Sequence, residues 1–168
     1  MRNTVEALPV ILRKDAVELF SKYKVYSERE LNSRYNILCE GYVKTVNVEA
    51  RLTALMANTM VIPAALRYQG EVAMSVNATK AAGIDNGAQM DLLRTLTTAI
   101  STLQKASADL EHALGHHADG DAYAHAKHMR DAVIPAMNAA RAAGDRLEGL
   151  VSDEHWPLPT YREMLFIK

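Results

Sequence analysis

Residues 27–82 contain one proline, Pro63, and otherwise follow a helical pattern. The stretch opens on a capping box, in which the Ser27 oxygen accepts from the Glu30 amide while the Glu30 side chain reaches back. At the α-helical rise per residue, a helix of this length would span roughly 80 Å. We therefore expect one very long helix over about residues 28–82, interrupted only at Pro63.

Alternating steps of three and four residues trace an apolar seam along this helix. The seam runs through Tyr35, Leu38, Tyr42, Thr45, Glu49, Leu52, Met56, Thr59, Pro63 and Leu66. A second stripe, through Cys39, Val43, Val46, Ala50 and Ala57, widens the surface that we expect to be buried. The uncharged run between Arg51 and Arg67 is shorter than the ~20 residues that cross a bilayer, so the pattern favours a buried helix over a membrane span.

Three further segments complete the predicted fold. Residues 1–26 carry two short helices, and long helices follow over about residues 88–114 and 121–151 after glycine-containing turns. Pro135 lies inside the last helix and must remove a backbone hydrogen bond there. Short loops make sequential helices antiparallel. We predict an all-α chain of one domain, residues 1–168: short docking helices (1–26), an up-down bundle (27–151) and a docked tail (152–168).

Composition narrows the classes of partner. Apolar residues make up 49% of the chain, and 19 basic against 20 acidic residues leave a net charge of −1. This balance gives no electrostatic reason to expect a nucleic-acid or membrane partner. A single cysteine, Cys39, and an acidic residue at position 6 where a signal peptide would be apolar favour a cytoplasmic protein.

The helix lengths leave part of the long helix without a partner. The second and third long helices would reach roughly 40 and 46 Å, about half the span of the first. We expect residues 27–55 to overhang the bundle, covered in part by residues 1–26 and otherwise by a partner outside the chain. One hypothesis is therefore a stand-alone helical adaptor or regulator that binds a partner through residues 27–55.

Histidines gather around the loop between the second and third helices. His112 and His116 before the loop, and His125 and His128 after it, are spaced so that an antiparallel helix pair would bring them together around a divalent metal. The alternative is that polar helix ends near a loop simply expose polar residues. No Glu-x-x-His pair of the di-iron bundle type occurs in the chain, so a metal-binding bundle is the weaker hypothesis.

Glu49 is the one charged residue placed in the predicted seam. It would either lie at the edge of the seam or pair with a basic residue, such as Arg34 or Arg141, inside the fold. Alternatively, it would reach across to a partner domain.

Several segments resemble the C-terminal region of type III glutamine synthetases. They are Asn-Ser-Arg-Tyr-Asn-Ile at 32–37, residues 40–50, Ile-Pro-Ala-Ala at 62–65, and Trp-Pro-Leu-Pro-Thr-Tyr-Arg-Glu-Met-Leu-Phe at 156–166. Residues 3–9 are similar to the segment that leads into that region. The likeness covers nearly the whole chain in the same order.

The resemblance implies a parent enzyme that makes glutamine from glutamate, ammonia and ATP with Mg²⁺ or Mn²⁺, and that assembles as a homo-oligomer. The family's nucleotide, glutamate and metal ligands lie upstream of the region matched, so we assign no catalytic residue and no cofactor to this chain. Matched positions would instead serve the fold, packing on the catalytic domain, or contacts with neighbouring subunits. These candidates are Arg34, Tyr35, Glu40, Tyr42, Lys44, Asn47, Glu49, Pro63, Trp156, Pro157, Pro159, Tyr161 and Arg162.

Overall fold

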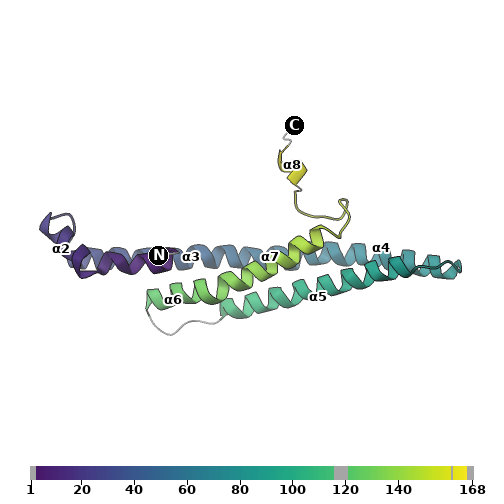
Figure 1. The fold of residues 1–168 in the computed structure, drawn as a ribbon, viewed down its shortest axis with the longest axis horizontal. Coiled ribbons are helices and arrows are strands. Elements are labelled where there is room, and N and C mark those ends of the chain that lie inside the picture. Colours follow the sequence, from purple (N-terminus) through teal and green to yellow (C-terminus); the bar gives the residue numbers. More distant parts are fainter. Residues whose placement is uncertain (1–2, 116–120, 160, 166–168) are drawn as a thin grey trace. The chain divides into compact units, whose positions relative to one another are not determined.

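The computed structural model describes residues 3–115, 121–159 and 161–165, and these residues form helices and connecting turns without a β-strand (Figure 1). The predicted all-α class is confirmed. The predicted helices are found close to their expected bounds. The elements are α1 (Thr4–Ala7), the 3₁₀ helix η1 (Leu8–Leu12), α2 (Lys14–Lys22), α3 (Glu28–Met56), the π-helical turn η2 (Ala57–Val61), α4 (Ile62–Ala81), α5 (Gly87–Gly115), α6 (Ala122–His128), the π-helical turn η3 (Met129–Val133), α7 (Ile134–Glu148) and α8 (Tyr161–Leu165).

The start of the long helix has the predicted capping box. The Glu30 amide donates to Ser27 Oγ at 3.3 Å, and Glu30 Oε2 accepts from the Ser27 amide at 2.7 Å and from its hydroxyl at 2.8 Å. The amide bond, followed by the hydroxyl bond, lowers the pKa of the Glu30 carboxyl. Residues 160–163, Thr-Tyr-Arg-Glu, have the sequence pattern of a second capping box, but Thr160 lies outside the described residues.

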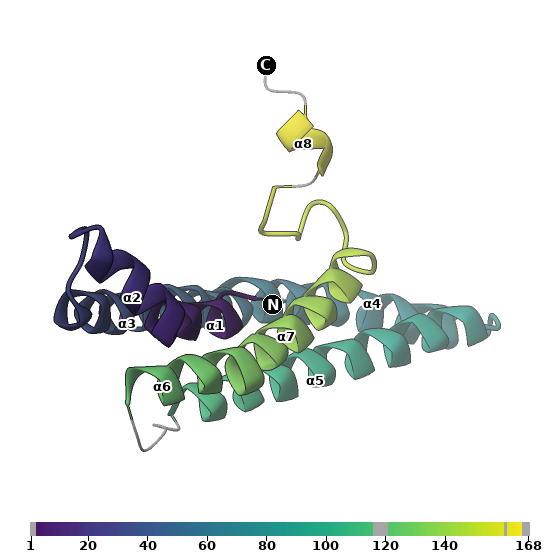
Figure 2. The ribbon, with the colours of Figure 1, turned by 60° about the vertical axis from the view of Figure 1, so that its left-hand side comes forward.

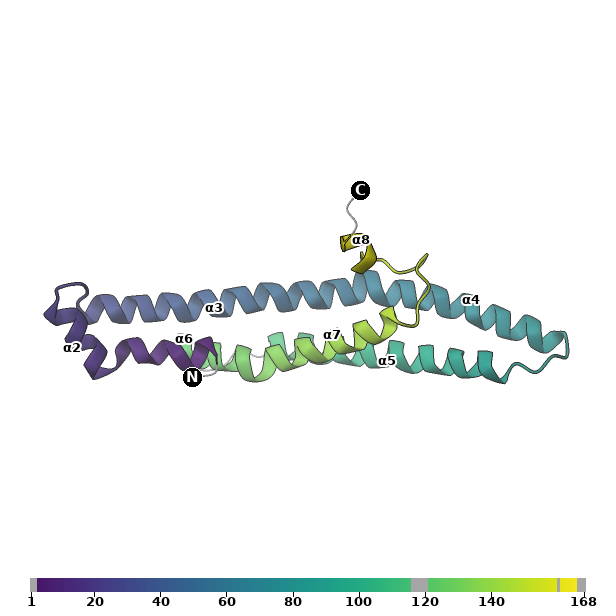
Figure 3. The ribbon, with the colours of Figure 1, turned by 45° about the horizontal axis from the view of Figure 1, so that its top comes forward.

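The long helix continues through α3, η2 and α4, and its end at Gly83 is set by backbone geometry. Gly83 has φ +71°, a left-handed conformation that L-residues other than glycine seldom adopt. The Asn86 side chain then donates to the Val76 carbonyl at 3.0 Å, which ties the turn back to α4. The helix therefore stops after residue 81 and the chain reverses into α5, as Figure 3 shows.

The chain divides into two compact units, and each boundary between them falls inside a helix. Unit 1 contains residues 1–51 and 112–135, and unit 2 contains residues 52–111 and 136–168. The single domain expected from the sequence stays a prediction.

Unit 2 has an apolar core contributed by η2, α4, α5 and α7. Leu96, Ile100 and Leu103 of α5 and Leu147 of α7 are among its buried members. Buried residues of α5 recur at steps of three and four, through Leu96, Ile100, Leu103, Ser107 and Leu110, and the polar Ser107 is 1% exposed. The Gln69 side chain of α4 also donates to Thr97 Oγ1 of α5 at 2.6 Å.

In unit 1, the N-terminal helices lie alongside α3 (Figures 2 and 3). Short helices are marginal alone, so docking must stabilise them. Val5 of α1 and Leu31 of α3 are fully buried, and α1 also contacts α6. Residues 112–135 belong to the same compact unit as this part of α3. Residues 1–26 thus pack with this part of the long helix as expected, and residues 112–135 add cover that the helix lengths did not predict; a partner outside the chain stays a prediction.

The predicted seam of the long helix is also wrong in part. Leu38 and Leu52 are 50% and 51% exposed, Leu66 is 46% exposed, and the polar seam positions Thr45, Glu49 and Thr59 are exposed as well. The buried side follows the second predicted stripe instead, through Cys39, Val46, Ala50 and Ala57, joined by Ala54. Small side chains let helix backbones approach closely, so the buried face carries alanines while several leucines face outward.

Two π-helical turns interrupt the long helices immediately before their prolines. The Ile62 amide donates to the Ala57 carbonyl and the Ile134 amide to the Met129 carbonyl, five residues back in each case. Because proline lacks an amide hydrogen, an α-helix would lose a bond at Pro63 and Pro135. The wider turns accompany both prolines, and the same tetrapeptide, Val-Ile-Pro-Ala, stands at 61–64 and 133–136.

Candidate functional site

Unit 1 has a hollow of about 520 Å³ between the N-terminal segment and the start of α3. Its lining residues are Ile11, Tyr26, Glu30, Ser33, Arg34, Ile37 and Leu38. The Arg34 guanidinium lies over the Tyr26 ring, 4.2 Å from its centroid. This contact places Arg34, one of the residues named from the family resemblance, at the hollow. Ile37 and Leu38 are 63% and 50% exposed. We call these seven residues the α3 hollow.

Tyr35 lies in unit 1, on the buried side of α3. Its ring centroid is 6.1 Å from that of Tyr123 in α6. Burial, followed by the neighbouring Cys39, Asp121 and Tyr123, raises the pKa of Tyr35 to about 12. Burial likewise raises the pKa of the Cys39 thiol, against the lowering effect of its hydrogen bond with Tyr35. A buried thiol of this kind is not an activated nucleophile.

Tyr42 lies near an ion pair on η3 and also near Glu49. Arg130 donates to both carboxylate oxygens of Asp131, at 2.6 and 2.8 Å. Burial raises the pKa of Tyr42, and Asp131 and Glu49 act in the same direction against Arg130. Glu49 is exposed and not buried in the seam. The two suggested partners make other contacts: Arg34 with Tyr26, and Arg141 with Asp145 at 3.6 Å.

The other predicted residues of α3 make local surface contacts. Lys44 Nζ lies 3.8 Å from a Glu40 carboxylate oxygen, and both side chains are largely exposed. The Asn47 side-chain oxygen accepts from Arg51 Nε at 3.1 Å. Exposed pairs of this kind contribute little to stability. These residues therefore leave a polar strip on the surface of α3.

In unit 2 the first part of the tail packs on the helices. Trp156 and Leu158 pack against the core, and Pro63 and Pro157 are half-buried. His155 Nε2 lies 3.0 Å from Glu71 Oε1, and its ring centroid is 5.8 Å from that of Tyr68. Tyr161 and Arg162 belong to α8, and their side chains lie outside what the structure describes, as does Phe166.

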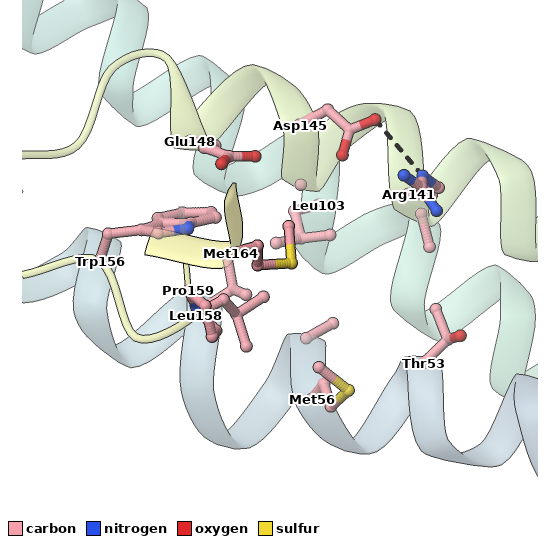
Figure 4. Close-up of a pocket in the computed structure, with 14 residues that line it drawn as sticks. Thr53, Met56, Leu103, Arg141, Asp145, Glu148, Trp156, Leu158, Pro159 and Met164 are labelled. Atoms are coloured by element: carbon pink, nitrogen blue, oxygen red, sulfur yellow. Dashed lines mark ion pairs between the residues drawn. The ribbon is translucent and has the colours of Figure 1, made fainter. Parts of the chain in front are cut away.

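Docking of the tail leaves a cavity of about 330 Å³ in unit 2. Figure 4 shows it bounded by α7 on one side and by the helix that carries Thr53 and Met56 on the other, with Trp156, Leu158 and Met164 between them. Pro159 also lines it, so two predicted family residues, Trp156 and Pro159, help to build it. We call this space the tail cavity.

The histidines that the structure describes do not form a metal site with other described residues. His128 Nε2 lies 2.9 Å from the Ala113 carbonyl oxygen. Over residues 3–115, 121–159 and 161–165, no group of three or more His, Cys, Asp and Glu residues is placed to hold a metal ion. His116 lies outside these ranges, so the site proposed for His112, His116, His125 and His128 stays a prediction.

One polar bridge in unit 2 was not anticipated. The Ser107 hydroxyl donates to Asn58 Oδ1 at 3.1 Å, and Asn58 Nδ2 donates to Glu111 Oε1 at 2.8 Å. Asn58 belongs to the π-helical turn, whose extra residue changes which side chains face α5. The repeated Val-Ile-Pro-Ala tetrapeptide is the sequence signal that would have marked this turn.

Comparison with known proteins gives one consistent family. Residues 1–80 match the family described as the glutamine synthetase C-terminal domain. The chain is 32% identical over 173 aligned residues to the type-3 glutamine synthetase of Dictyostelium discoideum, and the alignment includes 99% of the chain. The chain is therefore similar to glutamine synthetases of type 3, and its first 80 residues match the C-terminal domain of that enzyme. The resemblance stated from the residues is thereby confirmed.

Two further relatives extend the same match. The chain is 24% identical to a glutamine synthetase of Butyrivibrio fibrisolvens over 96% of its length, and 26% identical to one of Bacteroides fragilis over 86%. It spans about a quarter of the relatives' length: 24% of the Dictyostelium protein, 23% of the Butyrivibrio protein and 21% of the Bacteroides protein. Within the described residues, the helices lack a segment long and apolar enough to cross a bilayer.

Proposed function

We propose that this chain is a non-catalytic domain that packs against the catalytic domain of a type III glutamine synthetase and against neighbouring subunits. Support comes from its match to the glutamine synthetase C-terminal domain and from the small share of its relatives that it spans. The ATP-dependent synthesis of glutamine, with its Mg²⁺ or Mn²⁺, would belong to the rest of that cytoplasmic enzyme. In this proposal the helical chain serves assembly or regulation.

The observation that carries the proposal is the exposed apolar surface of the α3 hollow. Ile37 and Leu38 lie on a well-capped helix, and yet Ile37 is 63% exposed and Leu38 is 50% exposed. Covering a side chain of this size stabilises an interface by about 1.5–3 kcal/mol. Arg34, held over Tyr26, adds a fixed guanidinium at the edge of the same hollow. An apolar centre with an ordered arginine is a common composition for a protein interface.

The part of the synthetase that this chain does not include is the occupant that we propose. The relatives carry roughly three times as much sequence outside the matched region as within it, since the chain spans 24% of the Dictyostelium protein. A domain that is covalently joined to its partner by a short linker meets it at high effective concentration. No second protein is then needed to cover the hollow.

The test is to express the chain and the remainder of its synthetase as two polypeptides and to measure their association. We expect Ile37→Asp or Leu38→Asp to weaken association by at least about tenfold, because each places a charge in a buried apolar contact worth about 1.4 kcal/mol or more. Loss of glutamine synthesis by the reassembled enzyme would accompany it. The chain alone should make no glutamine.

Met74→Asp is the matched control. Met74 is also helical and is 66% exposed, but it lies on α4 and outside the α3 hollow. It should leave association unchanged. Equal effects of Leu38→Asp and Met74→Asp would contradict the docking surface. Val46→Asp is unsuitable, because Val46 is only 5% exposed and the substitution would disturb folding.

The same exposed surface also keeps the stand-alone adaptor as a second candidate. In that case the chain would not bind the remainder of a synthetase, and Leu38→Asp would instead disrupt a complex with an unrelated protein. The hypothesis of a metal-binding bundle has its own test, which is to measure the metal content of protein purified without a tag. A specific site would hold one metal ion per site, in a fixed ratio to the protein.

A further inference from the structure

The tail cavity of unit 2 has the size and lining of a small-molecule site. Its volume of about 330 Å³ falls at the lower end of the range of ligand pockets, roughly 300–1,000 Å³. Leu103 of α5, Met56 of α3 and Leu158 of the tail give it apolar walls. The lining comes from three helices and the folded tail, so the cavity depends on tertiary structure and not on a single surface loop.

The charged groups of the cavity are unusual for their position on α7. Asp145 and Glu148 lie in its last turn, where the helix dipole disfavours negative charge. Arg141 lies 3.6 Å from Asp145, but both side chains are more than half exposed, and such pairs are weak. Arg146 lies in the same turn and does not line the cavity. One arginine and two carboxylates leave the lining with an excess of negative charge.

Trp156 adds a surface that attracts cations. Tryptophan has the aromatic face that binds ammonium groups best, and Trp156 stands in the same lining as Glu148 and Asp145 (Figure 4). Within the described residues, the Glu148 side chain makes neither a hydrogen bond nor an ion pair. A carboxylate beside an indole and an apolar wall matches a ligand that is cationic at one end and apolar at the other.

We propose that the tail cavity binds a small organic cation, an ammonium group carrying an apolar body. The apolar part would lie against Leu103 and Leu158, and the ammonium would lie between Trp156 and the Glu148 carboxylate. This inference uses only unit 2 of the chain and does not depend on the function proposed above.

Fluorescence gives a direct test, because Trp156 is the only tryptophan in the sequence. Benzyltrimethylammonium should change the emission of the 168-residue chain in a saturable way. Benzyl alcohol and phenylacetate, its neutral and anionic counterparts, should bind at least about five times more weakly. No saturable change through the millimolar range, or equal binding of the three compounds, would overturn the proposal.

Two substitutions test the two parts of the site. Glu148→Gln keeps the shape and removes the charge, and it should weaken binding of benzyltrimethylammonium by about five- to tenfold. Gly144→Leu should block binding by filling the cavity, since a Cβ at Gly144 meets nothing within 4 Å. Circular dichroism would establish that both variants fold.

Glu154→Gln is the matched control for charge, because Glu154 is an exposed acid that does not line the cavity. It should bind benzyltrimethylammonium as the unsubstituted chain does. If Glu154→Gln and Glu148→Gln weakened benzyltrimethylammonium binding equally, the loss of affinity would come from the general negative charge of the surface. That result would overturn the assignment of Glu148. Unchanged binding by folded Gly144→Leu would place the ligand outside the cavity and overturn the site.

Discussion

The Tyr35 hydroxyl lies where ionisation is costly. Its side chain is largely covered, its ring is next to Tyr123, and Asp121 adds a negative charge nearby. A phenolate formed there would lose solvation and meet like charge, so the folded protein favours the neutral form. This explains how a polar residue can occupy the packed side of α3 without serving as an acid or a base at ordinary pH.

We predict a pH dependence of stability from this residue. The pKa of Tyr35 is raised from 10.0 to about 12 in the folded protein. A raised pKa means that its contribution is fully present below pH ~10 and is lost as pH rises through about 12. The free energy of unfolding, measured by urea denaturation, should therefore fall more steeply over this range for the unsubstituted protein than for Tyr35→Phe. Parallel curves would show that Tyr35 titrates as it does in the unfolded chain.

At the scale of the elements, two glycines on or beside α4 should respond in opposite ways to alanine. Gly83 has φ +71°, so Gly83→Ala should destabilise the protein by about 1–2 kcal/mol. Gly70 lies inside α4 with open space around its missing Cβ, so Gly70→Ala should stabilise by roughly 0.5–1 kcal/mol. Denaturant unfolding measures both. If Gly83→Ala were neutral, the left-handed turn would not be needed to end the helix.

The bounds of the helices could be predicted because caps and turns are local. The capping box at Ser27 and the Gly83 turn delimited the long helix to within one residue of its observed end at Ala81. The buried side could not be predicted as well. The hydrophobic pattern alone predicted that Leu38 and Leu52 would be buried. In the structure the closely packed helices instead bury small residues such as Ala50.

The α3 hollow and the tail cavity were harder to predict from the sequence than the helix bounds, because they depend on tertiary structure. The family pattern named Arg34 and Trp156, and the structure places Arg34 over the Tyr26 ring and Trp156 in the lining of the tail cavity; their role in the family stays a prediction. Their neighbours come from distant segments, as when the tail closes over Met56 and Leu103. The Asn58 bridge also depended on a π-helical turn, which changes the side of the helix that a residue occupies and which heptad spacing does not reveal.

At the scale of the whole molecule, two hypotheses differ in the size of the native protein. As a domain of a synthetase, the chain would be part of a polypeptide several times its own mass, because it spans 24% of the Dictyostelium relative. As an adaptor, it would exist as 168 residues. We expect intact-mass measurement of the protein captured from its source cells to give the larger value. Recombinant chain added to the same lysate would control for proteolysis. If it were recovered intact and the native protein had the same mass, the adaptor hypothesis would be favoured, and a separate protein would have to cover the α3 hollow.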